Sequence, residues 1–142
     1  MIKKTIKYKN FNGEERVQDC FFHMHPEEIV RLELEYKDGL EAAVNEMVEN
    51  EDRQGMGDLI LRVVLASYGQ RSEDGEHFVK SEELTGAFKQ SAAYGQLLMD
   101  LLTDEGAAVA FFQGVGFEQV GGDDRTNPVA PPKTQSRPKR GL

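Results

Sequence analysis

This 142-residue chain has little cysteine, no tryptophan and no long apolar run. Its single thiol, Cys20, cannot form an internal disulfide and is consistent with a reducing compartment. No stretch of about 18 apolar residues is present to span a bilayer, and the opening MIKKTIKYKN lacks the apolar core of a signal peptide. We therefore expect a cytoplasmic protein with no membrane partner.

Positive charge is also scarce, with 17 Lys and Arg against 25 Asp and Glu and a formal net charge of −8. Proteins that bind nucleic acid neutralise phosphates with basic side chains, so this balance argues against a nucleic-acid partner. The charge is uneven, because residues 1–120 carry a net −11 and residues 121–142 a net +3. An acidic body with a basic C-terminal segment is therefore expected.

Residues suited to metal binding or nucleophilic catalysis occur together only at Cys20, His23 and His25, in a C-x2-H-x-H pattern. A structural zinc site normally has four ligands, and the remaining histidine, His77, lies in another segment. A Cys–His nucleophilic pair would also need an orienting group and oxyanion donors, which the neighbouring sequence does not supply. The alternative is a packed thiol beside two phenylalanines, so we expect no metal, no cofactor and no enzymatic activity.

The N-terminal segment predicts a β-hairpin over residues 2–22. Ile2, Ile6 and Tyr8 share one parity of a period-2 pattern with β-branched and aromatic content. Residues 10–13, Asn-Phe-Asn-Gly, supply turn chemistry, and residues 16–22 can return as an antiparallel strand.

Helical periodicity dominates the rest of the chain. Apolar spacing predicts helices from Pro26 to about Tyr36, from a cap at Asp38, and from Met56 through Tyr68, with residues 49–57 as a loop. After a glycine turn and a short extended piece at 77–80, three further helices are expected, with caps at Ser81, Ser91 and Asp104. The fold class is therefore α+β and mostly helical, with about six helices following the hairpin.

The C-terminal segment differs in composition. It contains Gly-Gly, four prolines and scattered basic residues, which predicts a disordered tail over residues 119–142 after a single domain at 1–118. The basic residues of this tail could contact RNA, an acidic surface or nothing: they are Lys133, Arg137, Lys139 and Arg140.

Three segments together resemble a known family. They are MIKKTIKYKNFNGEERVQDCFFHM, LASYGQRSEDGEHFVKSEELTGAFKQSAAYGQLLMDLL and TDEGAAVAFFQGV, which cover nearly all of residues 1–115. They are similar to the tail assembly chaperones of long-tailed, siphovirus-type bacteriophages, especially in the Ser67-Tyr68-Gly69 step and the helices between Tyr94 and Phe112.

The resemblance implies a non-enzymatic protein that binds the tape measure protein, keeps it soluble, helps recruit major tail tube subunits and then leaves the finished tail. It implies work in the host cytoplasm, absence from the mature virion and multiple copies or homo-oligomers. An alternative is a structural tail completion or head–tail joining protein that remains in the virion.

Apolar residues that could be left exposed are the candidates for partner binding, with ordinary core packing as the alternative for each. They are Tyr8, Phe21, Phe22, Tyr94, Phe111 and Phe112. An unpaired edge of the 2–22 hairpin is a further candidate for self-association, because a free strand can template another.

Overall fold

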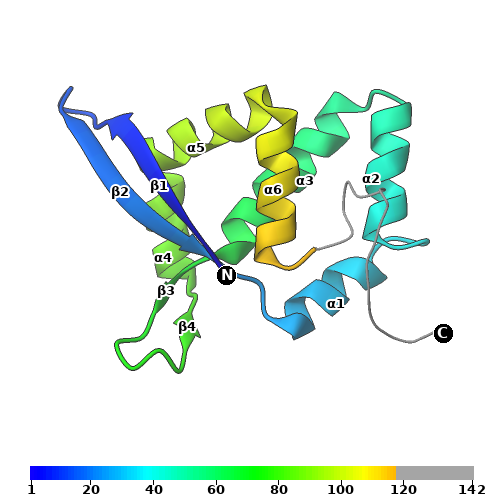
Figure 1. Ribbon diagram of the computed structural model, residues 1–142, viewed down its shortest axis with the longest axis horizontal. Helices are drawn as coiled ribbons and strands as arrows, with labels where there is room; N and C mark the ends of the chain where they lie inside the picture. The colour runs from blue at the N-terminus through cyan, green and yellow to red at the C-terminus, as the bar shows by residue number, and fades with distance from the viewer. Residues whose placement is uncertain (118–142) are drawn as a thin grey trace.

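The computed structural model describes residues 1–117, in which six helices and a four-stranded antiparallel sheet form the fold (Figure 1). The elements are β1 (Ile2–Lys9), β2 (Glu15–Phe22), α1 (Pro26–Leu34), α2 (Leu40–Glu49), α3 (Arg53–Ser67), β3 (Tyr68–Arg71), β4 (Phe78–Val79), α4 (Glu82–Lys89), α5 (Ala92–Thr103) and α6 (Glu105–Val115). The β1–β2 hairpin and α2 lie towards opposite ends of the long axis, with α3 and α6 between them. The predicted α+β class, the hairpin and the number of helices are confirmed.

The hairpin forms where its alternating pattern predicts it. β1 and β2 pair over eight residues each, from Ile2 opposite Phe22 to Lys9 opposite Glu15. The Asn10 side chain holds the turn, because its Oδ1 accepts hydrogen bonds from two backbone N–H groups at 2.9 and 3.0 Å. The inner face of the ribbon carries the buried Ile6, Cys20 and Phe22 and packs against the helices.

The sheet is larger than the sequence indicated, because Tyr68 starts strand β3 and does not extend the preceding helix. The helix α3 ends at Ser67, and Tyr68 lies opposite Phe22 on β2. Pairing with a strand edge therefore prevails over the helical spacing that Tyr68 shares with α3. Gly69 permits the close approach of β4, since a Cβ there would lie 2.6 Å from the carbonyl oxygen of Val79.

Three of the predicted helix caps are confirmed and one is wrong. Ser81, Ser91 and Asp104 accept hydrogen bonds from backbone N–H groups in the first turns of α4, α5 and α6. At α2 the capping residue is Gly39, with a φ of 90° and no side-chain bond, in place of the predicted Asp38. The Leu40 N–H donates to Oε1 of Glu33 at 2.6 Å, so a carboxylate from the preceding helix supplies the cap.

The predicted loop over residues 49–57 is also wrong in extent. The helix α2 continues to Glu49, and α3 begins at Arg53. Asp52 caps α3 by accepting a hydrogen bond from the Gly55 N–H at 2.9 Å. The loop was predicted because this region is charged and contains glycine, a composition that does not indicate such a cap.

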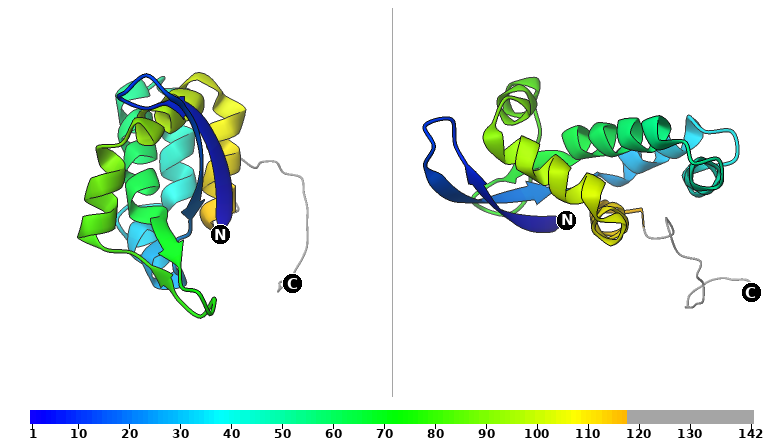
Figure 2. Two further views of the ribbon diagram at one scale, coloured as in Figure 1. Left: turned by 90° about the vertical axis from the view of Figure 1, so that its left-hand side faces the viewer. Right: turned by 90° about the horizontal axis from the view of Figure 1, so that it is seen from above.

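The core is centred on aromatic side chains that join the sheet to the helices. The Phe22 ring is fully buried, and its centroid lies 5.1 Å from that of Phe111 and 5.8 Å from that of Tyr68. Tyr68 also stacks on Phe88, with ring centroids 4.0 Å apart. Seen from above, α5 and α6 lie on one side of α3 (Figure 2). Within residues 1–117, no helix is long and apolar enough to cross a membrane.

Candidate partner-binding surface

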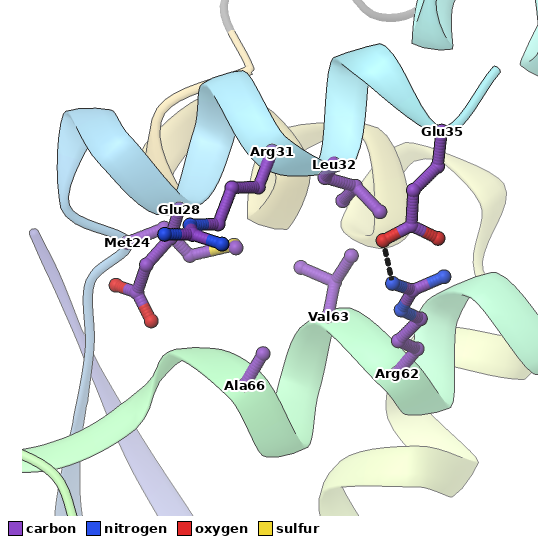
Figure 3. A pocket seen from close by; sticks show the side chains of 8 residues that line it. All are labelled: Met24, Glu28, Arg31, Leu32, Glu35, Arg62, Val63 and Ala66. Atoms are coloured by element: carbon purple, nitrogen blue, oxygen red, sulfur yellow. Dashed lines mark hydrogen bonds and ion pairs between the residues drawn. The ribbon is translucent and has the colours of Figure 1, made fainter.

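A small cleft lies between α1 and α3 (Figure 3). Its volume is about 230 Å³, and apolar side chains line its inner part: Met24, Leu32, Val63 and Ala66. Charged side chains form its rim: Glu28, Arg31, Glu35 and Arg62. The cleft therefore combines an apolar floor with charges of both signs.

The spacing of residues along α1 explains this arrangement. Glu28, Leu32 and Glu35 follow one another at intervals of four and three, so they share one side of the helix. Pro26 fixes the first turn, where the His25 N–H donates to Oε1 of Glu28 at 2.8 Å. These local contacts hold the acidic rim over the cleft.

The pair Arg62 and Glu35 closes one end of the cleft. Their side chains form an ion pair and hydrogen bond between α3 and the residue that follows α1. The hydrogen bond from Arg62 lowers the pKa of the Glu35 carboxyl below its usual value. Both side chains are about half exposed, at 48%, so solvent screens the pair and a partner can displace it at little cost.

Lys80 reaches the other end of the cleft from the segment after β4. Its Nζ donates to the carbonyl oxygens of His23 at 3.0 Å and Ala66 at 2.9 Å, and it forms an ion pair with Glu28. Burial alone would raise the pKa of the Glu28 carboxyl. Hydrogen bonds from Lys80 and from the His25 backbone outweigh that effect, so the pKa is lowered. This end of the cleft is therefore held by a network and is less open to rearrangement than the Arg62 end.

The cleft is better suited to side chains than to a small-molecule ligand. Its volume of about 230 Å³ is below the roughly 300–1,000 Å³ typical of ligand pockets. An apolar floor between two helices is the geometry in which an apolar helix face docks. The arrangement therefore fits a few aliphatic side chains of another polypeptide.

The aromatic residues that the sequence suggested for partner binding fall into two groups. Phe22, Phe111 and Phe112 are buried, with exposed fractions of 0–2%, so their side chains are part of the core. Tyr8 and Tyr94 are partly buried: the Tyr8 hydroxyl donates to Gln18, and Tyr94 packs against Phe88.

Phe21 is also partly buried, and it lies on the face of the hairpin opposite to Phe22. The Arg71 guanidinium carbon lies 4.5 Å from the centroid of its ring, a cation–π contact. The remaining predicted residues are Lys133, Arg137, Lys139 and Arg140, and these lie outside the described residues, as does the tail at 119–142.

The structure places Cys20 where it cannot act as a ready nucleophile. Its side chain is 1% exposed, and burial, with a smaller contribution from Asp19, raises the pKa of the thiol to about 11. The His23 ring packs edge-on against His25, and burial lowers the pKa of His23. Within residues 1–117, no group of three or more His, Cys, Asp or Glu side chains is placed to hold a metal ion.

Sequence reasoning missed the cleft. Arg62 and Glu35 are 27 residues apart, and Lys80 and Glu28 are 52 apart. Such long-range ion pairs cannot be predicted from a local motif, because charged residues at helical spacing have the same sequence pattern whether they line a cleft or a solvated surface.

Similarity to known proteins identifies a family for this chain. Neither the curated proteins nor the solved structures contain a match to this chain. The family model described as phage tail assembly chaperone matches residues 1–120, which is most of the chain and includes every described helix and strand. The chain therefore belongs to the phage tail assembly chaperone family.

Proposed function

We propose that this protein binds the tape measure protein of a long-tailed phage, keeps it soluble, and helps to recruit tail tube subunits during tail assembly. The observation that carries the proposal is the family match over residues 1–120. A tape measure protein is long and rich in helices, so its apolar faces need cover until tube subunits surround it. The protein acts by binding, without catalysis, in the cytoplasm of the host.

The cleft between α1 and α3 is the proposed contact for a helical segment of that partner. Ala66 is partly exposed and Leu32 is 4% exposed over the buried Val63, so the cleft offers a small apolar surface, and Arg31 and Arg62 offer positive charge beside it. An amphipathic helix would insert aliphatic side chains into the cleft and place acidic side chains against the arginines. The half-exposed Arg62–Glu35 pair would open to admit it.

Several copies acting on one tape measure protein are part of the proposal. A long helical chain offers repeated apolar faces, and one cleft of about 230 Å³ covers only a short length of it. The partly exposed Tyr8, Phe21 and Tyr94 are proposed as further contacts, either with the tape measure protein or between copies.

The decisive experiment is co-expression of the tagged, full-length protein with the tape measure protein of the same phage. We expect the tape measure protein to become soluble and to co-purify with several copies of the chaperone. The tape measure protein remaining insoluble, with the chaperone recovered alone, would contradict the proposal. Detection of the protein in purified virions would instead favour a structural tail completion or head–tail joining role.

A further inference from the structure

The strand β2 has one edge that is only partly occupied. β1 pairs with all eight residues of β2, whereas β3 pairs only with Phe21 and Phe22. On the β3 side, residues 15–20 therefore have no strand partner within residues 1–117.

The alternation of an antiparallel ladder shows which backbone groups face this open edge. The His23 N–H donates to the Ser67 carbonyl oxygen at 2.8 Å, so the backbone N–H and C=O groups of odd-numbered residues at the end of β2 face β3. Counting back by twos, Glu15, Val17 and Asp19 direct their N–H and C=O groups to the open side. These groups are available for pairing with a further strand.

The space beside the edge is open because β3 leaves β2 after Gly69 to pair with β4. A notch of about 550 Å³ results, lined by residues 18–21 on one side and 68–75 on the other. The side chains of Glu15 and Asp19 are exposed, and Val17 is 65% exposed between them. An uncovered strand edge of this kind promotes aggregation unless the protein covers it.

We propose that residues 133–137 of this chain, Lys-Thr-Gln-Ser-Arg, add as a strand antiparallel to β2 at this edge. The segment has five residues between Pro132 and Pro138, and the open edge from Glu15 to Asp19 also has five. Because proline cannot continue a ladder, the two prolines fit the ends of a five-residue strand.

Antiparallel pairing of the two five-residue segments end to end would place Lys133 opposite Asp19 and Arg137 opposite Glu15. This register gives two cross-strand pairs of opposite charge. Gln135 would lie opposite the exposed Val17.

The net charges of the two parts of the chain also differ in sign. Residues 125–142 contain five basic and no acidic residues, whereas residues 1–117 carry 12 basic and 22 acidic ones. Long-range attraction therefore also favours the docking.

Chain direction and reach are both compatible with the pairing. Met24, just after β2, donates its N–H to the Val115 carbonyl oxygen at 3.3 Å, so the chain leaves α6 near the end of β2. The fifteen residues 118–132 can span at most about 50 Å, more than the roughly 35 Å width expected for 117 compact residues. A segment arriving from this end and running towards the hairpin turn is antiparallel to β2.

The test is amide hydrogen exchange of the full-length protein, followed residue by residue by NMR. We expect the Val17 and Asp19 amides to be protected, and the double variant Lys133→Glu/Arg137→Glu to exchange about tenfold faster at both positions. The core amide of Val63 reports folding and should not change. The matched control Lys139→Glu/Arg140→Glu, with the same change of charge beyond Pro138, should keep the protection.

A charge swap provides the positive test. Adding Glu15→Lys and Asp19→Lys to the Lys133→Glu/Arg137→Glu variant should restore protection of Val17. The proposal is overturned if Val17 exchanges equally fast in the wild-type protein and in Lys133→Glu/Arg137→Glu, or if the control loses protection to the same extent. Protection that falls on tenfold dilution would overturn docking within one chain, because an intramolecular contact does not depend on concentration.

Discussion

Lys80 and Glu28 form an ion pair between the segment after β4 and the first turn of α1, 52 residues apart in the sequence. The side chains are only 15% and 32% exposed. Because Lys80 also binds the carbonyl oxygens of His23 and Ala66, one ammonium group connects the end of β2, α1 and the end of α3. It therefore fixes the position of α1 against α3, and with it one end of the cleft.

Replacing Lys80 with Met should lower the free energy of unfolding by about 2 kcal/mol, since the change leaves Glu28 and two carbonyl groups without their donor. Urea unfolding followed by circular dichroism measures the effect. Lys89→Met is the matched control, because Lys89 is exposed in the last turn of α4, and it should change stability by less than about 0.5 kcal/mol. Equal effects of the two substitutions would contradict the structural role of Lys80.

The lowered pKa of Glu28 predicts a specific dependence of stability on pH. A carboxyl whose pKa is lower in the folded state binds its proton more weakly there, so it stabilises the fold above its unfolded pKa. That contribution is fully present above the usual value of 4.5 and is lost as the pH falls through the lower folded value. The variant Glu28→Gln should therefore show a weaker loss of stability below pH 4.5 than the wild-type protein. An unchanged acid profile would show that Glu28 makes no such contribution.

Two glycine substitutions in helices, at Gly114 and at Gly95, should have opposite effects on the stability of the protein. A Cβ at Gly114 would lie 2.2 Å from Cγ2 of Ile2, so Gly114→Ala should destabilise the protein by about 1–3 kcal/mol. Gly95 is also helical, and a methyl group there would meet no neighbouring side chain within 4 Å, so Gly95→Ala should stabilise the protein by about 0.5–1 kcal/mol. Thermal unfolding distinguishes the two.

A second substitution separates the clash from a general helix effect at this position. Adding Ile2→Ala to Gly114→Ala should cost less than the sum of the two single changes, because the short side chain removes the clashing methyl group. Additive losses would indicate that the contact between β1 and α6 is not the cause.

Much of the fold could be predicted because it follows from local patterns. The alternation in β1, the Asn10 turn and the caps at Ser81, Ser91 and Asp104 each involve residues close in sequence. Tyr68 could not be placed by the same reasoning, because it fits the apolar spacing of α3. Only its pairing with Phe22, 46 residues earlier, makes it a strand residue.

The candidate cleft could not be predicted for a related reason. The aromatic pattern predicted binding residues at Phe22, Phe111 and Phe112, and these side chains instead fill the core. The cleft residues come from two helices whose relative placement depends on the distant contact of Lys80 with Glu28. Family resemblance, which does not depend on the site, was the part of the functional prediction that the comparison confirmed.

The buried thiol of Cys20 should react slowly. With its pKa raised to about 11, the side chain is almost entirely protonated at pH 8. The native protein should therefore react with a thiol reagent at least about 100-fold more slowly than the protein unfolded in urea, where the pKa is near 8.5. Colorimetric detection with a disulfide reagent measures both rates. Rapid modification of the native protein would show that Cys20 is accessible.

Filling the cleft should weaken partner binding without unfolding the protein. Ala66 is partly exposed on the cleft floor, so Ala66→Leu should occupy space that we assign to the tape measure protein, at a stability cost within about 1–3 kcal/mol. The matched control is Ala87→Leu on α4, where the side chain is exposed and away from the cleft. We expect the dissociation constant for the tape measure protein to rise about tenfold for Ala66→Leu, equivalent to about 1.4 kcal/mol, and to stay unchanged for Ala87→Leu. If both folded variants bind as tightly as the wild-type protein, the partner contacts another surface, and the partly exposed Tyr8, Phe21 and Tyr94 become the next residues to substitute.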